Sequence, residues 1–290
     1  MSAKRILTLI TLILFVVTAV SCVSSCKHSR PDGLRFVGRG KLEPAQSTES
    51  GLVVVTHGWI EKGRGGWPED MAIEIHKRVE PNLWLCGYFD WSTGAKAFNP
   101  TDAAEYARDI AGPELAGEII KLGSDLQHIH LIGHSSGCWA ISEAAKRLAG
   151  ETKADLHLTF LDAYIPAFWE ESLLGNVNAP AKSKCWAEHY YTRDYTLGWT
   201  QQDLSGAHNV DVTNIDQMLK DHNFPWKWYY ATVSGKYPED SFLDNRRLVW
   251  MADGIEYGFA RSLEAADAGS WDRSLKLPTG NEAVRLRKKE

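Results

Sequence analysis

The sequence predicts an α/β protein, with a mostly parallel central sheet flanked by helices in a single domain. The chain has 290 residues, of which 44% are hydrophobic and 24% are charged, and this is enough to bury one large core. Its apolar runs lack the polar alternation of a half-exposed strand, as is typical of strands buried on both faces of a parallel sheet. Segments with helical spacing separate these runs, and that alternation favours a parallel α/β sheet.

The apolar runs set the order of the elements. The first strand is expected in "GLVVVTHGW", residues 51–59, which ends in a glycine turn. Later strands are expected over residues 83–91, 128–133 and 155–162. Helices are expected over residues 67–80, 100–122, 137–150 and 224–233. In the second helix Asp102 is the expected N-cap, and Pro113 predicts a kink or two helical pieces.

Residues 163–220 show no helical or strand period, apart from a short candidate strand in "HNVDVT". A long irregular stretch in a compact domain is usually functional. This segment is therefore a candidate lid or cap insertion within the domain, which we place at residues 51–290. Its aromatic residues, between 164 and 199, can line a pocket or pack as ordinary core, and the sequence leaves both interpretations open.

Residues 1–26 have the pattern of an export signal. A basic start, "MSAKR", precedes the apolar run 6–20 and the small residues of "SCVSSC". Because small residues precede Cys22 and Cys26, the segment resembles the processing box of bacterial lipoproteins, with either cysteine as the lipid-bearing one. We expect an exported protein, either a membrane-anchored lipoprotein or a periplasmic or extracellular protein, with residues 27–50 as a polar tether.

The charge pattern excludes one class of partner. The formal net charge is −5, and no block of Lys and Arg is long enough for a nucleic-acid surface. We therefore expect no nucleic-acid partner, and the oligomeric state is left open. Among the other cysteines, Cys86 and Cys138 are expected to be buried thiols because their neighbours are apolar.

The strongest chemical signal lies in "HIHLIGHSSGCWA", residues 128–140. Gly133, Ser135 and Gly137 fit the Gly-x-Ser-x-Gly pattern, between an expected strand and an expected helix. That context predicts a nucleophile elbow, a sharp turn that exposes the serine Oγ at the edge of the sheet. A serine hydroxyl needs a base to take its proton and a third group to orient that base. We predict Ser135 as the nucleophile.

An acid is available after Ser135. Asp162 ends the expected strand 155–162, at the functional edge of a parallel sheet, and it is the predicted acid. Later acids stay open as competitors, namely Asp194, Asp203, Asp211, Asp216 and Asp221.

The base must follow the acid in the order Ser, Asp, His. His222 stands just ahead of the expected helix 224–233 and is the predicted base. His189 and His208 lie in the irregular stretch, where roles in a lid or on the surface are expected. His128 and His130 precede the serine and are expected to be packed or hydrogen-bonded core histidines.

An oxyanion hole requires two backbone donors. One is the N–H of Ser136, the residue after the nucleophile. The other is expected from Trp59 in "THGW", where Gly58 lets the backbone approach. His57 is expected to orient this loop rather than to act as the base. This chemistry needs no metal and no cofactor.

With these motifs in order, the chain resembles the pancreatic-type lipase family of α/β hydrolases. The likeness rests on "VVVTHGWIEKGRGGW", "CGYFDWS", "HIHLIGHSSGCWAISEAAKRL" and "LTFLDAYIP", and it covers residues 51–166. It implies the α/β-hydrolase fold, with Ser135, Asp162, Trp59 and Ser136 in the roles given above. The turn "LDAYIP" departs from the family's "LDPA", so hydrolysis of triglycerides at an interface is not implied.

The expected function is that of a serine hydrolase of the lipase or esterase type, which cleaves an ester or lipid small molecule through an acyl-enzyme. The same residues would serve an acyltransferase, a thioesterase or an amidase. A catalytically inactive binding protein of this fold and a structural surface lipoprotein are both disfavoured by the complete set of triad and oxyanion residues.

Overall fold

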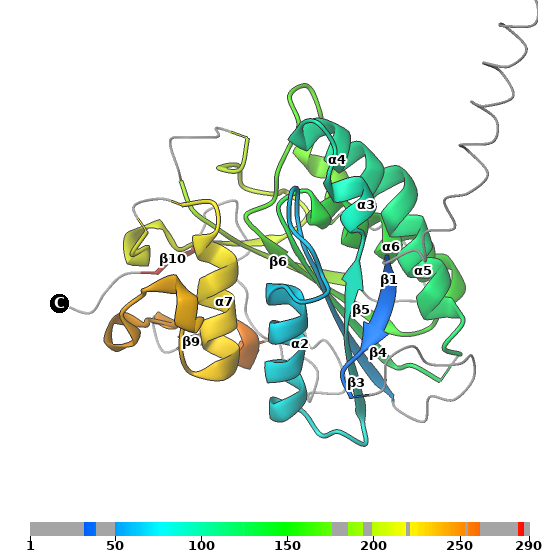
Figure 1. Cartoon of the computed structure of the whole chain (residues 1–290), viewed down its shortest axis with the longest axis horizontal. Helices are drawn as coiled ribbons and strands as arrows, with labels where there is room; N and C mark the ends of the chain where they lie inside the picture. The colour runs from blue at the N-terminus through cyan, green and yellow to red at the C-terminus, as the bar shows by residue number, and fades with distance from the viewer. Residues whose placement is uncertain are drawn as a thin grey trace, which may run out of the picture. The chain divides into compact units, whose positions relative to one another are not determined.

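An eight-stranded sheet with the strand order β1-β3-β2-β4-β5-β6-β7-β10 forms the centre of the fold (Figure 1). Only β1 runs antiparallel to its neighbour, and every other pair in this sheet is parallel. The strands are β1 (Gly33–Phe36), β2 (Gly51–Thr56), β3 (Trp84–Asp90), β4 (His128–His134), β5 (Asp155–Leu161), β6 (Cys185–Tyr191), β7 (His208–Asp211) and β10 (Val284–Arg285). A separate antiparallel pair consists of β8 (Met251–Ala252) and β9 (Ile255–Glu256). The mostly parallel central sheet is the predicted one.

The computed structural model describes residues 32–38, 50–123, 125–175, 185–193, 199–218, 221–252, 255–261 and 284–286. These residues belong to one compact unit, Asp32–Glu290. The predicted export segment, residues 1–26 with Cys22 and Cys26, lies outside the described residues and stays a prediction. No helix in the described part of the chain is both long and apolar enough to cross a bilayer.

Helices cover both faces of the sheet. Figure 1 shows α2 and α7 on one face and the group from α3 to α6 on the other, and the apolar core divides in the same way. The α-helices are α2 (Trp67–Arg78), α3 (Ser92–Ala95), α4 (Pro100–Tyr106), α5 (Gly112–Ile120), α6 (Gly137–Glu151) and α7 (Phe224–Ser234). Short 3-10 helices are η2 (Glu171–Leu173), η3 (Thr213–Ile215), η4 (Glu239–Ser241) and η5 (Asn245–Arg247).

The helix expected over residues 100–122 consists of two α-helical pieces, as Pro113 predicted. A π-helical turn, η1 (Ala107–Ala111), joins α4 to α5, and Pro113 is the second residue of α5. Proline has no N–H to donate to the preceding turn, and a π-turn is one way in which a helix accommodates that loss.

The prediction of Asp102 as the N-cap of this helix is wrong. Asn99 caps α4 by accepting the Asp102 N–H at 2.9 Å, because Pro100 occupies the first helical position.

Two segments that were expected to be irregular carry strands of the central sheet. β6 and β7 lie inside residues 163–220, and of these two only β7 was anticipated, from "HNVDVT". β1 lies inside the expected tether 27–50 and pairs with β3 at the edge of the sheet. The sheet therefore extends well beyond the part that uninterrupted apolar runs had predicted.

The described cysteines are all free thiols. Cys86 and Cys138 are buried, as the sequence predicted, and burial raises the pKa of the Cys86 thiol to about 12. Neither thiol is available as a nucleophile at neutral pH, because the thiolate is the reactive form.

Candidate active site

Ser135 stands on a sharp turn between β4 and α6. Its φ of 53° lies in the left-handed region, which is uncommon for a residue with a side chain. The Ser135 N–H donates to the Leu161 carbonyl at 3.0 Å, which ties the turn to β5. Glycine is required at position 137, because a Cβ there would collide with the backbone carbonyl of His57. The elbow predicted from the sequence is thus present, with the geometry that its glycines allow.

The structure brings together the three residues predicted as nucleophile, acid and base. His222 Nε2 lies 2.8 Å from Ser135 Oγ, and His222 Nδ1 lies 2.6 Å from Asp162 Oδ2. Because a carboxylate only accepts hydrogen bonds, Nδ1 carries the proton and the Nε2 lone pair faces the serine hydroxyl. This is the arrangement in which an imidazole can take the proton of a serine.

Asp162 is held in place by the backbone around it. It is fully buried at the end of β5, and its φ is 48°. Its Oδ1 accepts the Thr192 N–H at 2.8 Å, so Oδ2 is directed at His222. Burial raises the pKa of Asp162, and the hydrogen bonds from His222 and Thr192 oppose that rise without cancelling it. Thr192 acts through its backbone, and for this reason no residue pattern pointed to it.

The competing acids have other partners. Asp203 accepts the Tyr191 hydroxyl, and Asp211 forms an ion pair with Arg193 at 3.1 Å. Asp216 and Asp221 build the turn that precedes α7. Asp216 accepts the Asp221 N–H at 3.1 Å, and Asp221 accepts the Asn223 N–H at 2.7 Å. Asp194 lies outside the described residues.

The two predicted oxyanion donors lie on either side of the serine. In the loop after β2, the Gly58 N–H donates to Glu61 Oε2 at 2.7 Å and the Ile60 N–H donates to the Ala95 carbonyl at 2.8 Å. Between them, the Trp59 N–H has no acceptor among the described residues, and neither has the Ser136 N–H. Unpaired N–H groups beside a nucleophile are what an oxyanion requires.

The same loop approaches the serine closely because residue 58 is glycine. A Cβ at Gly58 would lie 2.8 Å from the Ser135 Cβ, too close for any other residue type. The Trp59 ring anchors the loop from the other side, since its Nε1–H donates to the Ala97 carbonyl at 2.9 Å.

His57 is buried and forms part of the scaffold of this loop. Its ring stacks on Trp91 with 5.1 Å between the ring centroids, and Trp91 Nε1–H donates to the His57 carbonyl at 3.0 Å. Asp90, 3.2 Å from His57 Nε2, also accepts the backbone N–H groups of Gly63 and Arg64. Burial alone would raise the pKa of Asp90, but hydrogen bonds with the side chains of His57 and Ser92 and with these two N–H groups lower it well below its usual range. The contacts agree with an orienting role for His57.

Sequence reasoning missed two side chains, His134 beside the base and Glu61 beside His134. His134, the residue before the nucleophile, has its ring 4.7 Å from the His222 ring and its Nε2 3.1 Å from the His222 carbonyl. Its Nδ1 lies 3.1 Å from Glu61 Oε2. His134 was read only as the variable position of the elbow pattern. Its place on the turn next to Ser135 was the one available signal.

The expected surface or lid roles of His189 and His208 do not fit the structure, because both residues are on strands of the sheet. His189 is fully buried on β6, where its Nε2 accepts the Ala163 N–H at 3.2 Å and its Nδ1 lies 3.1 Å from Asn209 Oδ1. His208 begins β7 and stacks on Tyr257 with 6.3 Å between the ring centroids.

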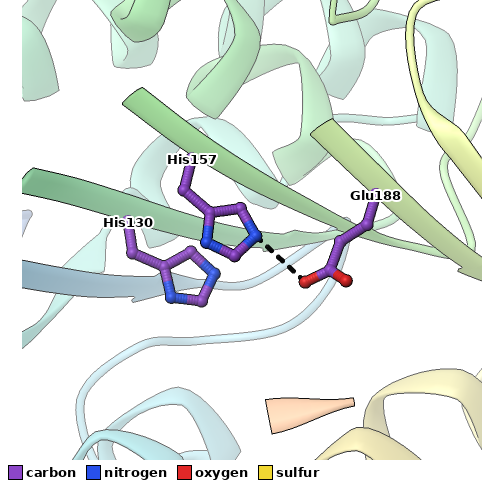
Figure 2. Close-up of side chains that lie close together, drawn as sticks. All are labelled: His130, His157 and Glu188. Carbon is purple, nitrogen blue, oxygen red and sulfur yellow. Dashed lines mark hydrogen bonds and ion pairs between the residues drawn. The ribbon is translucent and has the colours of Figure 1, made fainter. Parts of the chain in front are cut away.

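A second polar cluster lies within the sheet, away from Ser135. Figure 2 shows His130, His157 and Glu188, which come from β4, β5 and β6 and offer potential metal-ligand atoms within 4.8 Å of one another. The two rings stack with 3.8 Å between their centroids and 6° between their planes. The nitrogen lone pairs of parallel rings lie in separate parallel planes, whereas the ligands of one ion must converge on it.

Hydrogen bonds within the protein satisfy the Glu188 carboxylate. Oε1 accepts from the Thr159 hydroxyl at 2.8 Å and faces His157 Nε2 at 3.0 Å, and Oε2 accepts from the Tyr190 hydroxyl at 2.6 Å. His130 Nε2 lies 2.8 Å from Thr159 Oγ1. We interpret the cluster as a hydrogen-bonded network that joins three strands, and His130 as the hydrogen-bonded core histidine that the sequence predicted.

Comparison with known proteins gives the family likeness of this region. A family model described as Lipase matches residues 42–178. Pancreatic lipase-related protein 2 of Bos taurus is 36% identical over 118 residues, which are 39% of this chain and 24% of the relative. Pancreatic triacylglycerol lipase of Mus musculus is 36% identical over 119 residues, 40% of this chain and 24% of the relative. The chain thus spans about a quarter of the length of these relatives.

Among solved structures, Aspergillus fumigatus lipase B aligns with a TM-score of 0.38 and 10% sequence identity, over 74% of this chain and 59% of that chain. Over the segment that carries Trp59, Ser135 and Asp162, this chain is similar to the pancreatic-type lipases, as its motifs predicted. His222 lies outside the matched segment.

Proposed function

We propose that the chain is a serine hydrolase that cleaves carboxylic esters through an acyl-enzyme at Ser135. The observation that carries the proposal is the continuous hydrogen-bonded line from Ser135 Oγ through His222 to Asp162, with distances of 2.8 Å and 2.6 Å. The likeness to lipases over residues 42–178 supports an ester as the bond that is cleaved.

The proposed reaction has two halves. In the first, Ser135 Oγ attacks the ester carbonyl carbon while His222 Nε2 takes the hydroxyl proton, and the N–H groups of Trp59 and Ser136 bind the oxyanion. The carbon–oxygen bond to the alcohol then breaks, and His222 returns its proton to the departing alcohol. In the second half, water gives a proton to His222 and attacks the acyl carbon. The acid leaves, and Ser135 recovers its proton.

The loops around the site carry exposed apolar side chains, and these support a substrate with an apolar acyl chain. Ile60, the residue after Trp59, is 68% exposed. Phe98 is 94% exposed and follows Ala97, whose carbonyl accepts the Trp59 Nε1–H. Phe168 lies on the loop after Asp162 and is also exposed. Single exposed apolar residues are common. Three of them on the loops beside one nucleophile fit contact with an acyl chain.

Turnover of p-nitrophenyl esters tests the proposal. We expect the wild type to hydrolyse them and Ser135→Ala to lose at least about 10³-fold in kcat, because no other group replaces the nucleophile. Ser205→Ala is the matched control, since the exposed Ser205 hydroxyl donates to Glu171 Oε2 at 3.0 Å and lies outside the line of proton transfer. Circular dichroism and the thermal midpoint check that both variants fold. Full turnover by Ser135→Ala would exclude the proposed mechanism.

A further inference from the structure

One carboxylate oxygen connects the three segments that form the site. Glu61 Oε2 accepts the Gly58 N–H at 2.7 Å, next to the predicted oxyanion donor Trp59. The same oxygen lies 3.1 Å from Nδ1 of His134, which precedes Ser135 on the elbow. The other ring nitrogen of His134 lies 3.1 Å from the carbonyl of His222. The oxyanion loop, the elbow and the loop of the base are therefore joined through two side chains.

Each ring nitrogen of His134 faces a hydrogen-bond acceptor. A carbonyl oxygen can only accept, so Nε2 must carry a proton. Nδ1 faces a carboxylate that already accepts the Gly58 N–H, so Nδ1 is also a donor if Glu61 is ionised. Burial on its own raises the pKa of Glu61, but the His134 ring and the Gly58 N–H outweigh it and lower the pKa to about 2. Glu61 is therefore a carboxylate at neutral pH, and the His134 ring can donate to it through Nδ1 while Nε2 donates to the His222 carbonyl.

Aromatic side chains enclose this pair. The His134 side chain is 2% exposed and that of Glu61 is 21% exposed. Trp67 packs its edge against the His134 ring with 5.9 Å between the centroids and stacks on Trp226 of α7 at 4.7 Å. Water is therefore largely excluded, and a charge-assisted hydrogen bond in such a place is stronger than one at the surface.

We propose that Glu61 and His134 form an ion pair that positions the base His222 against Ser135 and the Trp59 N–H against the oxyanion. The inference rests on the proposed function, because positioning has a consequence only if Ser135 is the nucleophile. Neither side chain touches the reacting atoms. Both act through backbone groups, the His222 carbonyl and the Gly58 N–H.

The proposal predicts a loss in kcat rather than in substrate binding. In Glu61→Gln the carboxylate charge is lost. In His134→Asn the amide can still reach Glu61 but no longer reaches the His222 carbonyl. We expect each variant to lower kcat on p-nitrophenyl esters about 10- to 100-fold with KM within about 2-fold, the scale of a misplaced catalytic group. The double variant should cost no more than the larger single loss, since the pair acts as one unit.

Glu69→Gln is the matched control. Glu69 accepts a backbone N–H of the same loop, that of Gly65 at 2.6 Å, in a solvent-exposed hydrogen bond. Its kcat should stay within about 2-fold of the wild type, as is usual for surface substitutions. Unchanged kcat in both Glu61→Gln and His134→Asn would overturn the positioning role, and so would a rise in KM alone.

A spectroscopic measurement tests the ion pair without reference to activity. In ring-¹⁵N-labelled protein at pH 7, both His134 nitrogens should appear as N–H, with the resonance assigned by its absence in His134→Asn. In Glu61→Gln one of the two should become unprotonated. An unprotonated His134 nitrogen in the wild type would contradict the pair. If Ser135 fails to react with a fluorophosphonate, the proposed function fails while the spectroscopic result stands. If Ser135 reacts and Glu61→Gln turns over normally, only the positioning role fails.

Discussion

At the scale of single residues, the site contains backbone conformations that are unfavourable for residues with a side chain. Ser135, Asp162 and Ile60 all have positive φ, at 53°, 48° and 62°. Such conformations cost about 1–3 kcal/mol each and persist only where the surroundings fix them. Here the fixing contacts are visible. Each of these residues donates its own N–H to a backbone carbonyl. The acceptors are the carbonyls of Leu161 for Ser135, of Tyr190 for Asp162 and of Ala95 for Ile60. Strain is concentrated where the nucleophile, the acid and the oxyanion loop meet.

The hydrogen bond from His222 to Asp162 leads to a prediction at this scale. In Asp162→Asn the amide can donate to Nδ1, which moves the imidazole proton to Nε2 and removes the acceptor for the serine proton. We expect kcat to fall about 10⁴-fold with little change in fold, as for loss of a triad carboxylate in general. Stopped-flow hydrolysis of p-nitrophenyl acetate measures it. Asp203→Asn, at a competing acid, should retain activity. If Asp203→Asn lost activity while Asp162→Asn kept it, the acid would be misassigned.

The triad could be predicted from the sequence because its members are recognised by residue type, by their order in the chain and by the elements next to them. A serine between glycines, an aspartate at a strand end and a histidine before a helix are all visible in the chain. The pair Glu61 and His134 could not be found in this way, because its partners are 73 residues apart and neither belongs to a pattern. Thr192 was hidden for a different reason, since its contribution is a backbone N–H.

At the scale of elements, strands with continuous apolar runs were predicted directly, whereas β6, which buries charged and polar side chains, was missed. β2 and β4 are apolar enough to be recognised directly. β6 reads "CWAEHYY", and its Glu188 and His189 are fully buried. Burial of such side chains is tolerable only when neighbours satisfy them, and here Thr159 on β5 and Asn209 on β7 do so. That compensation comes from other strands and is invisible within the segment itself.

β1 was missed because it is short and lies in polar sequence. Gly33–Phe36 obtains its strand hydrogen bonds from β3, and the Leu34 N–H donates to Glu118 on α5 at 2.8 Å. Such long-range contacts override local propensity. The aromatic residues between 164 and 199 differ in burial. Tyr190 is core, whereas Phe168 is fully exposed.

At the scale of the whole molecule, buried histidines make the fold sensitive to acid. Burial lowers the pKa of His128, His189 and His208 from 6.5 to about 4, and it lowers the pKa of His130 and His157 well below 6.5. Between about pH 6.5 and pH 4, the unfolded chain then binds more protons than the folded one. The stability that these neutral histidines contribute is present above pH 6.5 and is lost as the pH falls towards 4 and beyond.

We therefore expect the free energy of unfolding to decrease steeply between pH 6.5 and pH 4. Each histidine that titrates only in the unfolded state adds a slope of about 1.4 kcal/mol per pH unit. Urea unfolding at half-unit pH intervals measures the slope, and His128→Gln should reduce it by about one histidine's share. Stability that is constant from pH 7 to pH 5 would mean that these rings are not held neutral in the fold.

The reactivity of Ser135 towards a fluorophosphonate tests the central claim most directly, because this reagent reacts with a serine activated by its base. Intact mass and peptide mapping after exposure of the full chain should show one adduct, on Ser135. We expect no adduct in Ser135→Ala and much slower labelling in His222→Gln. A folded wild-type protein that stays unlabelled, or that carries its adduct on another residue, would contradict the account.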